Sequence, residues 1–228
     1  MPKNTSVIFK LQGTIDDLTF VNSQRYKPHV RRKRGTVKKA TLNSTLDQHK
    51  DLIKIANRQA KLIFQSLKNE HHDGSFWTRL VPLFFKEVKA GNPFPLRNLL
   101  KLECSKVHKL EMLLGINYSI AVTVAEQQLQ VAVELKDQPT FKHDSCIRGY
   151  ELAVIALYPD FKEEACGKEV AAAPIVPLRS ELQPHHFELR MPSSEAPFVL
   201  LLRIAASIDR GETTNQPNLN GLAVVYVS

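Results

Sequence analysis

Three kinds of residue in this chain could do chemistry: paired histidines, paired carboxylates and a dense run of lysines and arginines. The histidine pairs are His71-His72 and His185-His186. Imidazole nitrogen is a common metal ligand, but adjacent residues of a strand point to opposite faces of the sheet. Neither pair has the spacing of a metal site, so we expect no metal and no cofactor.

The paired carboxylates, Asp16-Asp17 and Glu163-Glu164, are typical of a turn and of a solvated loop. The sequence contains no G-x-S-x-G elbow, no phosphate loop and no G-x-G-x-x-G fingerprint. A catalytic triad can still be assembled from residues that are distant in sequence. An enzyme therefore stays as a third hypothesis, and we expect the protein to have no enzymatic activity.

The basic run is the most distinctive feature of the sequence. Residues 18–46 hold eight basic side chains and no acidic one, whereas the charges of the remaining residues cancel. The net charge of +8 therefore belongs to this segment alone. Its members are Arg25, Lys27, Arg31, Arg32, Lys33, Arg34, Lys38 and Lys39.

Three functions are open for this segment. Lysine and arginine could neutralise phosphates of a nucleic acid, with Tyr26 stacking on a base. The charges could instead protect the edge of a sheet from pairing with other chains. They could also contact the acidic part of a neighbouring copy, because residues 116–228 carry a net charge of −5 and residues 47–115 one of +5.

The elements around the basic run begin with a hairpin. Residues 6–12 and 18–21 have the composition of strands, Asp16-Asp17 that of a turn, and residues 26–34 that of a returning strand. Pro28 favours an edge position for the returning strand because it donates no backbone hydrogen bond.

A helical pattern follows the hairpin. Apolar residues recur at three- and four-residue steps from Leu42 to Leu67, which predicts one long helix capped by Asn43 or Ser44. A second helix is predicted over residues 76–90, with Ser75 as its cap, a kink or a split at Pro82 and Gly91 after its end. Shorter helices are expected at residues 96–102 and 107–114.

Beyond Gly115 the pattern is typical of strands separated by polar turns. Seven strands at short spacing predict an antiparallel β-sandwich of immunoglobulin-like type. The predicted strands are residues 117–124, 127–135, 148–158, 169–176, 185–191, 197–208 and 221–227.

The sequence therefore predicts an α+β protein with two domains. Residues 1–115 would form the basic hairpin and a helical domain, and residues 116–228 the sandwich. No secretory signal is expected, because the first apolar stretch covers only residues 7–9, and no stretch is long enough to span a membrane. Three widely spaced cysteines favour reduced thiols in the cytoplasm, with a Cys146–Cys166 disulfide as the alternative for an exported protein.

The N-terminal motif resembles that of a known group of proteins. Gly13, Leu18-Thr19-Phe20, Ser23 and residues 30–35 are similar to the opening of an uncharacterised bacterial family of Bacteroidetes type, in which a glycine, an L-x-F/Y strand and V-R-x-K precede a helical middle and a β-rich end. This chain lacks the glycine often found in the turn, and its basic run is heavier. The resemblance covers about 25 residues and implies the order of the elements, but no activity or ligand.

The leading functional hypothesis is a non-enzymatic binding or structural module that contacts an unknown protein partner, or itself, through the sandwich. The alternative is a nucleic-acid-binding protein that acts through residues 25–39.

Overall fold

The computed structural model describes residues 13–23, 26–33, 44–92, 96–115, 117–141, 146–208, 212–214 and 216–228. The chain divides into two compact units, Met1–Asp47 and Gln48–Ser228. The sequence predicts a domain boundary near residue 115, whereas the division between the two compact units falls after residue 47 of the chain. The helices between these positions share a core with the strands that follow, as described below.

The first unit contains a small antiparallel sheet, sheet A, made of β1 (Gly13–Ile15), β2 (Leu18–Ser23) and β3 (Tyr26–Arg32). Asp16 adopts a positive φ of 49° in the turn between β1 and β2, as the Asp16-Asp17 pair predicted. β3, which contains Pro28, is an edge strand. None of the side chains described in this sheet is buried.

Two helices begin the second unit. α1 (Ser44–Ser66) and α2 (Phe76–Ala90) lie where the apolar periodicity predicted them. Gly91 ends α2 in the left-handed conformation at φ 71°, which glycine adopts without strain. Pro82 is exposed, and α2 continues through it. A single 3-10 turn, η1 (Arg97–Leu99), and the short helix α3 (Leu110–Leu114) complete this region.

The remaining strands form two antiparallel sheets. Sheet C has the order β4-β5-β9, and sheet B has β10 and β6 at its centre. On sheet B, β12 and β11 pair with the outer edge of β10, and β7 and β8 pair with the outer edge of β6. The strands are β4 (Tyr118–Ala125), β5 (Gln128–Leu135), β6 (Gly149–Asp160), β7 (Ala165–Ala172), β8 (Val176–Pro177), β9 (His185–Arg190), β10 (Val199–Ile208), β11 (Glu212–Thr213) and β12 (Asn220–Val227).

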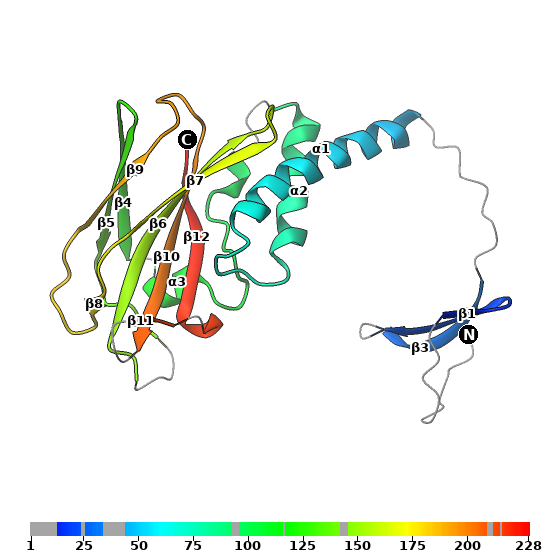
Figure 1. Ribbon diagram of the computed structural model, residues 1–228, viewed down its shortest axis with the longest axis horizontal. Coiled ribbons are helices and arrows are strands. Elements are labelled where there is room, and N and C mark those ends of the chain that lie inside the picture. The colour runs from blue at the N-terminus through cyan, green and yellow to red at the C-terminus, as the bar shows by residue number, and fades with distance from the viewer. Residues whose placement is uncertain are drawn as a thin grey trace. The chain divides into compact units, whose positions relative to one another are not determined.

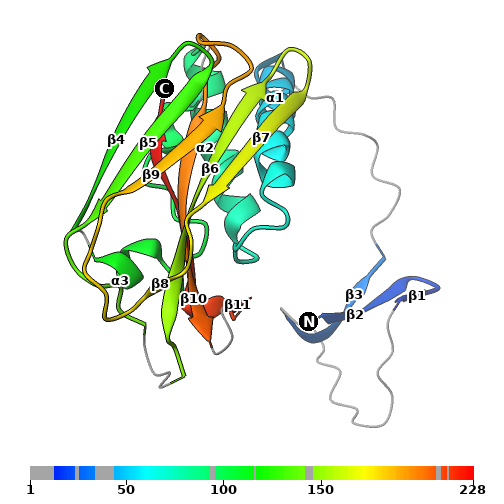
Figure 2. The ribbon, with the colours of Figure 1, turned by 60° about the vertical axis from the view of Figure 1, so that its left-hand side comes forward.

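Sheet B is covered on both faces, which explains the unbroken apolar runs of β6 and β10. Alternate residues such as Val154 and Leu202 pack with sheet C, whereas Ile155 and Leu201 pack with α1 and α2. The second unit therefore has three layers: sheet C, sheet B and the helices (Figures 1 and 2). The predicted α+β class with antiparallel sheets is confirmed.

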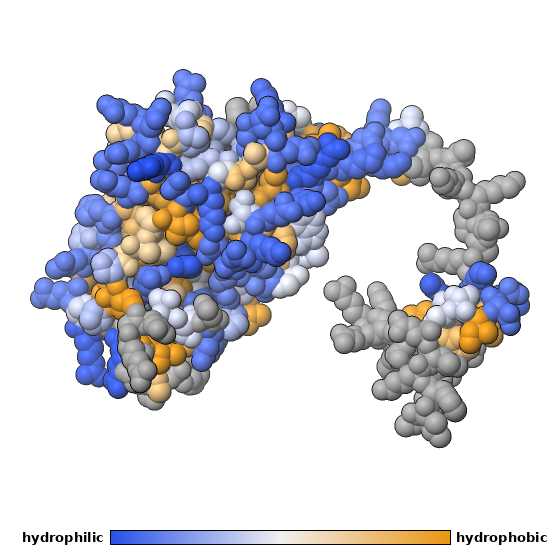
Figure 3. All heavy atoms as spheres, in the orientation of Figure 1, coloured by the Kyte–Doolittle hydropathy of each residue, from blue (hydrophilic) through white to orange (hydrophobic). Residues whose placement is uncertain are grey.

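The N-terminal half of α1 is less covered than its pattern suggested. Ala56, Ala60 and Ile63 are buried, but Leu46 and Ile53 of the same stripe are 51% and 45% exposed. Apolar atoms reach the surface along the helical layer (Figure 3). A periodic stripe shows which face of a helix is apolar, but not how far the neighbouring elements extend along it.

Candidate functional site

The structure describes part of the basic segment. Arg31 and Arg32 lie in β3 and pair with Thr19 and Leu18 of β2, and Lys33 follows the strand. Lys27 also lies in β3, but its side chain is outside the described part. Arg25, Arg34, Lys38 and Lys39 lie outside the described residues, as does the strand predicted at residues 6–12.

The three described cations do not fold back onto acidic groups. Arg32 and Lys33 are exposed and Arg31 is half-buried, with its Nε atom buried and without a hydrogen-bond partner. Within the described ranges, no ion pair joins any of the three to a carboxylate. The exposed side chains of Arg32 and Lys33 can therefore reach an anionic partner.

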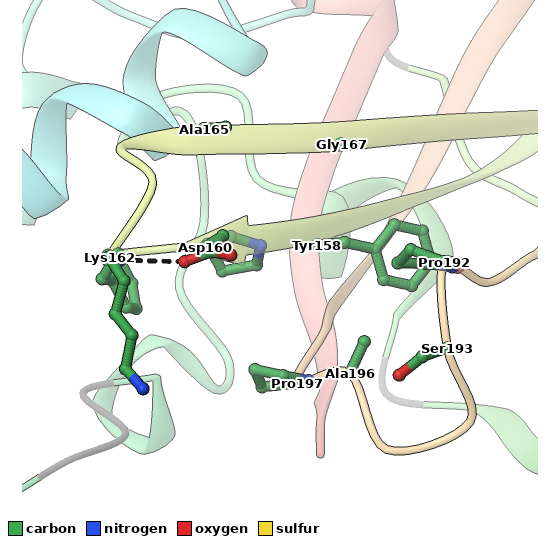
Figure 4. A pocket seen from close by; sticks show the side chains of 11 residues that line it. Tyr158, Asp160, Lys162, Ala165, Gly167, Pro192, Ser193, Ala196 and Pro197 are labelled. Atoms are coloured by element: carbon green, nitrogen blue, oxygen red, sulfur yellow. Dashed lines mark hydrogen bonds between the residues drawn. The ribbon is translucent and has the colours of Figure 1, made fainter.

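A mainly apolar pocket of about 520 Å³ lies where the β6–β7 hairpin meets the loop before β10. In Figure 4 the ring of Tyr158 lies beside Pro192, and Ala196 and Pro197 line the side formed by the loop. Burial raises the pKa of the Tyr158 hydroxyl to about 12, and the carboxylate of Glu169 adds to this shift. The hydroxyl is buried without a hydrogen-bond partner, so it stays protonated and is a poor proton acceptor.

The single carboxylate in this lining has a structural role. Asp160 accepts hydrogen bonds from the backbone N–H groups of Glu163 and Lys162, and these bonds lower the pKa of its carboxyl. The Lys162–Asp160 bond is the dashed line in Figure 4. The lining contains neither histidine nor cysteine. The pocket could hold a small apolar group, but its lining does not pair a nucleophile with a general base.

A second pocket, of about 320 Å³, is polar and lies beside an ion-pair network. Glu70, which follows α1, accepts hydrogen bonds from Lys168 of β7 and from Arg203 of β10. Arg203 also donates to Glu151 of β6 over 2.9 Å. Two carboxylates balance two cations, so the network fastens the loop after α1 to sheet B and leaves no net charge for an ionic ligand.

His71, of the first histidine pair, lies beside another histidine, His108. Burial lowers the pKa of His71, and the nearby His108 ring, at a centroid distance of 6.1 Å, lowers it further. Within the described residues, no cluster of three histidines, cysteines or carboxylates could hold a metal ion. Cys104 and Cys166 are free thiols with pKa values raised by burial, so the alternative Cys146–Cys166 disulfide is not formed.

The edges of the two large sheets differ in how they are protected. The outer edge of β12 is hydrogen-bonded to residues 101–104, for example from the N–H of Cys104 to the carbonyl of Leu222. β7 carries Lys168 and Glu169, and β9 carries charged side chains at residues 188 and 190. Bonded or charged edges resist pairing with other chains.

β4 is the exception. It has eight residues without charge or proline, and of the described strands β5 alone pairs with it. The N–H of Lys136 donates to the carbonyl of Asn117, so residue 117 directs its backbone groups toward β5. Because this direction alternates along an antiparallel strand, the other odd-numbered residues of β4 also direct their N–H and C=O groups toward β5. The N–H and C=O groups of the even-numbered residues therefore point outward. These residues are Tyr118, Ile120, Val122 and Val124.

The outer face of sheet C continues this exposed edge. A hollow of about 400 Å³ lies over small side chains such as Ala121, Thr123 and Ala132, bordered by His186 and Glu188. Edge and hollow together form one accessible surface of β4 and its neighbours. The sequence showed an uncharged strand here, but only the strand order reveals that it is an edge.

No protein-family model matches the chain, and no curated protein matches it. The similarity of the N-terminal motif to the uncharacterised bacterial family stays a prediction. No helix in the described part of the chain combines the length and apolarity needed to cross a membrane.

Proposed function

We propose that the protein is a non-enzymatic binding module that contacts another protein through the edge of sheet C. The observation that carries the proposal is the outer edge of β4, which is uncharged, free of proline and not paired on its outer side by any described strand. An exposed edge of this kind is a template for an added strand, and main-chain hydrogen bonds supply the affinity of such complexes.

An immunoglobulin-like arrangement of the two sheets belongs to this proposal. With β4, β5, β6, β7, β9, β10 and β12 lettered A, B, C, C′, E, F and G, sheet C reads ABE and sheet B reads GFCC′. This order supports the proposal, because the constant-type immunoglobulin domain has the same ABE and GFC strands. It differs in placing its fourth strand beside E. We place the module in the cytoplasm, in keeping with the free thiols of Cys104 and Cys166.

The test is selection from a displayed library of random peptides on the immobilised protein. We expect enriched peptides of alternating apolar residues that bind the wild type and not Val122→Pro. Proline at residue 122 removes an outward N–H group and leaves the β4–β5 hydrogen bonds in place. Val122→Thr, which keeps the N–H group and the branched shape, is the matched control.

Two results would count against this function. Peptides that bind Val122→Pro as well as the wild type would show that the edge is not used. Turnover in a broad hydrolase or transferase screen, lost on a point substitution, would show that the protein is an enzyme.

A second candidate function, nucleic-acid binding, is favoured by the exposure of Arg32 and Lys33 and by the lack of a described carboxylate partner for Arg31, Arg32 or Lys33. Phosphate contacts release counterions, and log affinity for duplex DNA then falls with log salt by a slope of about −0.9 for each neutralised phosphate.

A gel-shift assay at two salt concentrations tests this candidate. The triple variant Arg31→Glu/Arg32→Glu/Lys33→Glu should lose the shift that the wild type gives at low salt. Lys50→Glu/Lys54→Glu/Lys61→Glu makes the same change in net charge at exposed positions of α1 and should keep the shift. If the wild type shifts neither DNA nor RNA at low salt, the nucleic-acid hypothesis is wrong.

A further inference from the structure

We propose that the partner at this edge is a second copy of the chain, and that the two β4 strands pair antiparallel about a two-fold axis at Ala121. The proposal rests on the binding function assigned to the β4 edge and names its occupant. The pairing would join the two copies of sheet C into one continuous sheet. β4 is the outermost strand of sheet C, with β5 on its inner side (Figure 2).

The register follows from the backbone groups that point outward. A two-fold axis at Ala121 places Tyr118 opposite Val124 of the second copy, and Ile120 opposite Val122. These four residues are the ones whose N–H and C=O groups face away from β5. All of the outward groups of the strand therefore find partners, and no bulge or overhang is required.

The side chains also match themselves under this symmetry. Tyr118, Ile120 and Val122 are only partly buried against the core, and Val124 is 43% exposed, so each gains an apolar neighbour across the new pair. On the outer face, Ser119 meets Thr123 and Ala121 meets itself, and these small side chains leave the close approach unobstructed.

The composition of β4 allows the strand to pair with itself. No charged side chain lies on β4, so the symmetric pair places no like charges opposite each other.

Sedimentation equilibrium of the full chain tests the proposal, from about 1 µM to about 1 mM because contacts of small area associate weakly. We expect the wild type to form a dimer. Ala121→Lys and Ala121→Glu each place like charges opposite each other at the axis, and each should raise the dimer dissociation constant at least about tenfold. An equimolar mixture of the two variants should regain the dimer, because lysine then faces glutamate.

Crosslinking checks the register independently. Residues at the axis form a non-hydrogen-bonded pair, whose Cβ atoms lie about 5 Å apart. Ala121→Cys should therefore give a disulfide-linked dimer under mild oxidation. Val170→Cys, exposed on β7, and the wild type with its natural cysteines should give none above background.

A wild type that stays monomeric throughout the concentration range would overturn the proposal, as would a dimer that both charge variants retain. A monomer that still selects β4-dependent peptides would mean that the edge binds a different protein, so the binding function would stand without self-pairing. A monomer that selects no such peptide would contradict both the self-pairing and the binding function of the β4 edge.

Discussion

Glu70 is a nearly buried carboxylate whose partners come from distant parts of the chain. Its side chain is 8% exposed and lies between Lys168 and Arg203, which are 98 and 133 residues away in sequence. Removal of one member of a buried ion pair leaves the remaining charge without compensation, and the loss is larger than the net contribution of the intact pair.

We expect Glu70→Gln to lower the free energy of unfolding by about 3 kcal/mol. Glu164→Gln removes the carboxylate of an exposed pair with Arg58 and should change it by less than about 0.5 kcal/mol. Urea denaturation of both variants measures the difference. Equal effects would mean that the Glu70 network contributes no more than a surface pair.

Asp73 fastens the loop between α1 and α2. It accepts hydrogen bonds from the N–H and hydroxyl groups of Ser75 and from the N–H of Lys106. Burial favours the neutral form, but these hydrogen bonds and the Arg79 guanidinium outweigh it and lower the pKa of the carboxyl to about 2. Ser75, predicted as the cap of α2, makes no side-chain cap bond itself.

The lowered pKa gives a direction for the dependence on pH. The Asp73 carboxyl binds its proton less tightly in the folded state than in the unfolded chain, where its pKa has the ordinary value of 3.8. The stabilisation is therefore present above about pH 4 and is lost as the pH falls toward 2. We expect Asp73→Ala to cost about 1 to 2 kcal/mol at pH 7 and progressively less between pH 4 and pH 2. Urea midpoints across this range test it, with Glu195→Ala, at an exposed position in the loop before β10, as the control. A cost that is constant with pH would contradict this role.

At the scale of elements, α2 and the N-terminal half of α1 differ in what covers their apolar side chains. Leu80 of α2 is fully buried in the core that contains Leu201 and Val224 of sheet B, whereas Ile53 of α1 is 45% exposed. Truncation of a buried leucine removes transfer free energy and leaves a cavity.

We expect Leu80→Ala to lower the free energy of unfolding by about 3 kcal/mol. Ile53→Ala should change it by less than about 0.5 kcal/mol, partly because alanine is the better helix former. Thermal and urea unfolding of the two variants distinguish the positions. A cost at residue 53 close to that at residue 80 would show that α1 is covered along its whole length in solution.

Local pattern predicted the elements well. The three-to-four-residue spacing placed α1 and α2, and alternation or unbroken apolar runs placed six of the seven expected strands within two residues of their ends. The strand expected at residues 169–176 lies four residues earlier, as β7 (Ala165–Ala172). The two-residue strands β8 and β11 have no pattern of their own, because they are defined by the neighbours with which they pair. The helices expected at residues 96–102 and 107–114 are shorter in the structure, η1 and α3.

Arrangement in space was the part that the sequence did not determine. The basic segment stands out from composition alone, but the ion pairs of Glu70 join residues about a hundred positions apart, and no local signal links them. The open edge of β4 likewise depends on strand order. The division near residue 115 was expected because the pattern changes there, yet the helices before it and the strands after it share one core.

At the scale of the whole molecule, the division into two compact units has a direct test. We expect a chain of residues 44–228 to keep a single cooperative unfolding transition, with a free energy of unfolding within about 1 kcal/mol of the full chain. Circular dichroism in urea measures it. Loss of the cooperative transition would mean that the second unit requires the residues before α1.

The central position of β10 also governs how the protein is made. The helices leave the ribosome early, but the strand residues that cover their apolar faces lie in β6, β10 and β12. β6 also has to wait for β10, with which it forms backbone hydrogen bonds. Synthesis adds about 5 to 20 residues per second, so the apolar faces of the helices stay exposed to solvent for several seconds. We therefore expect a chaperone to bind the apolar faces of the helices until residues beyond 199 have left the ribosome.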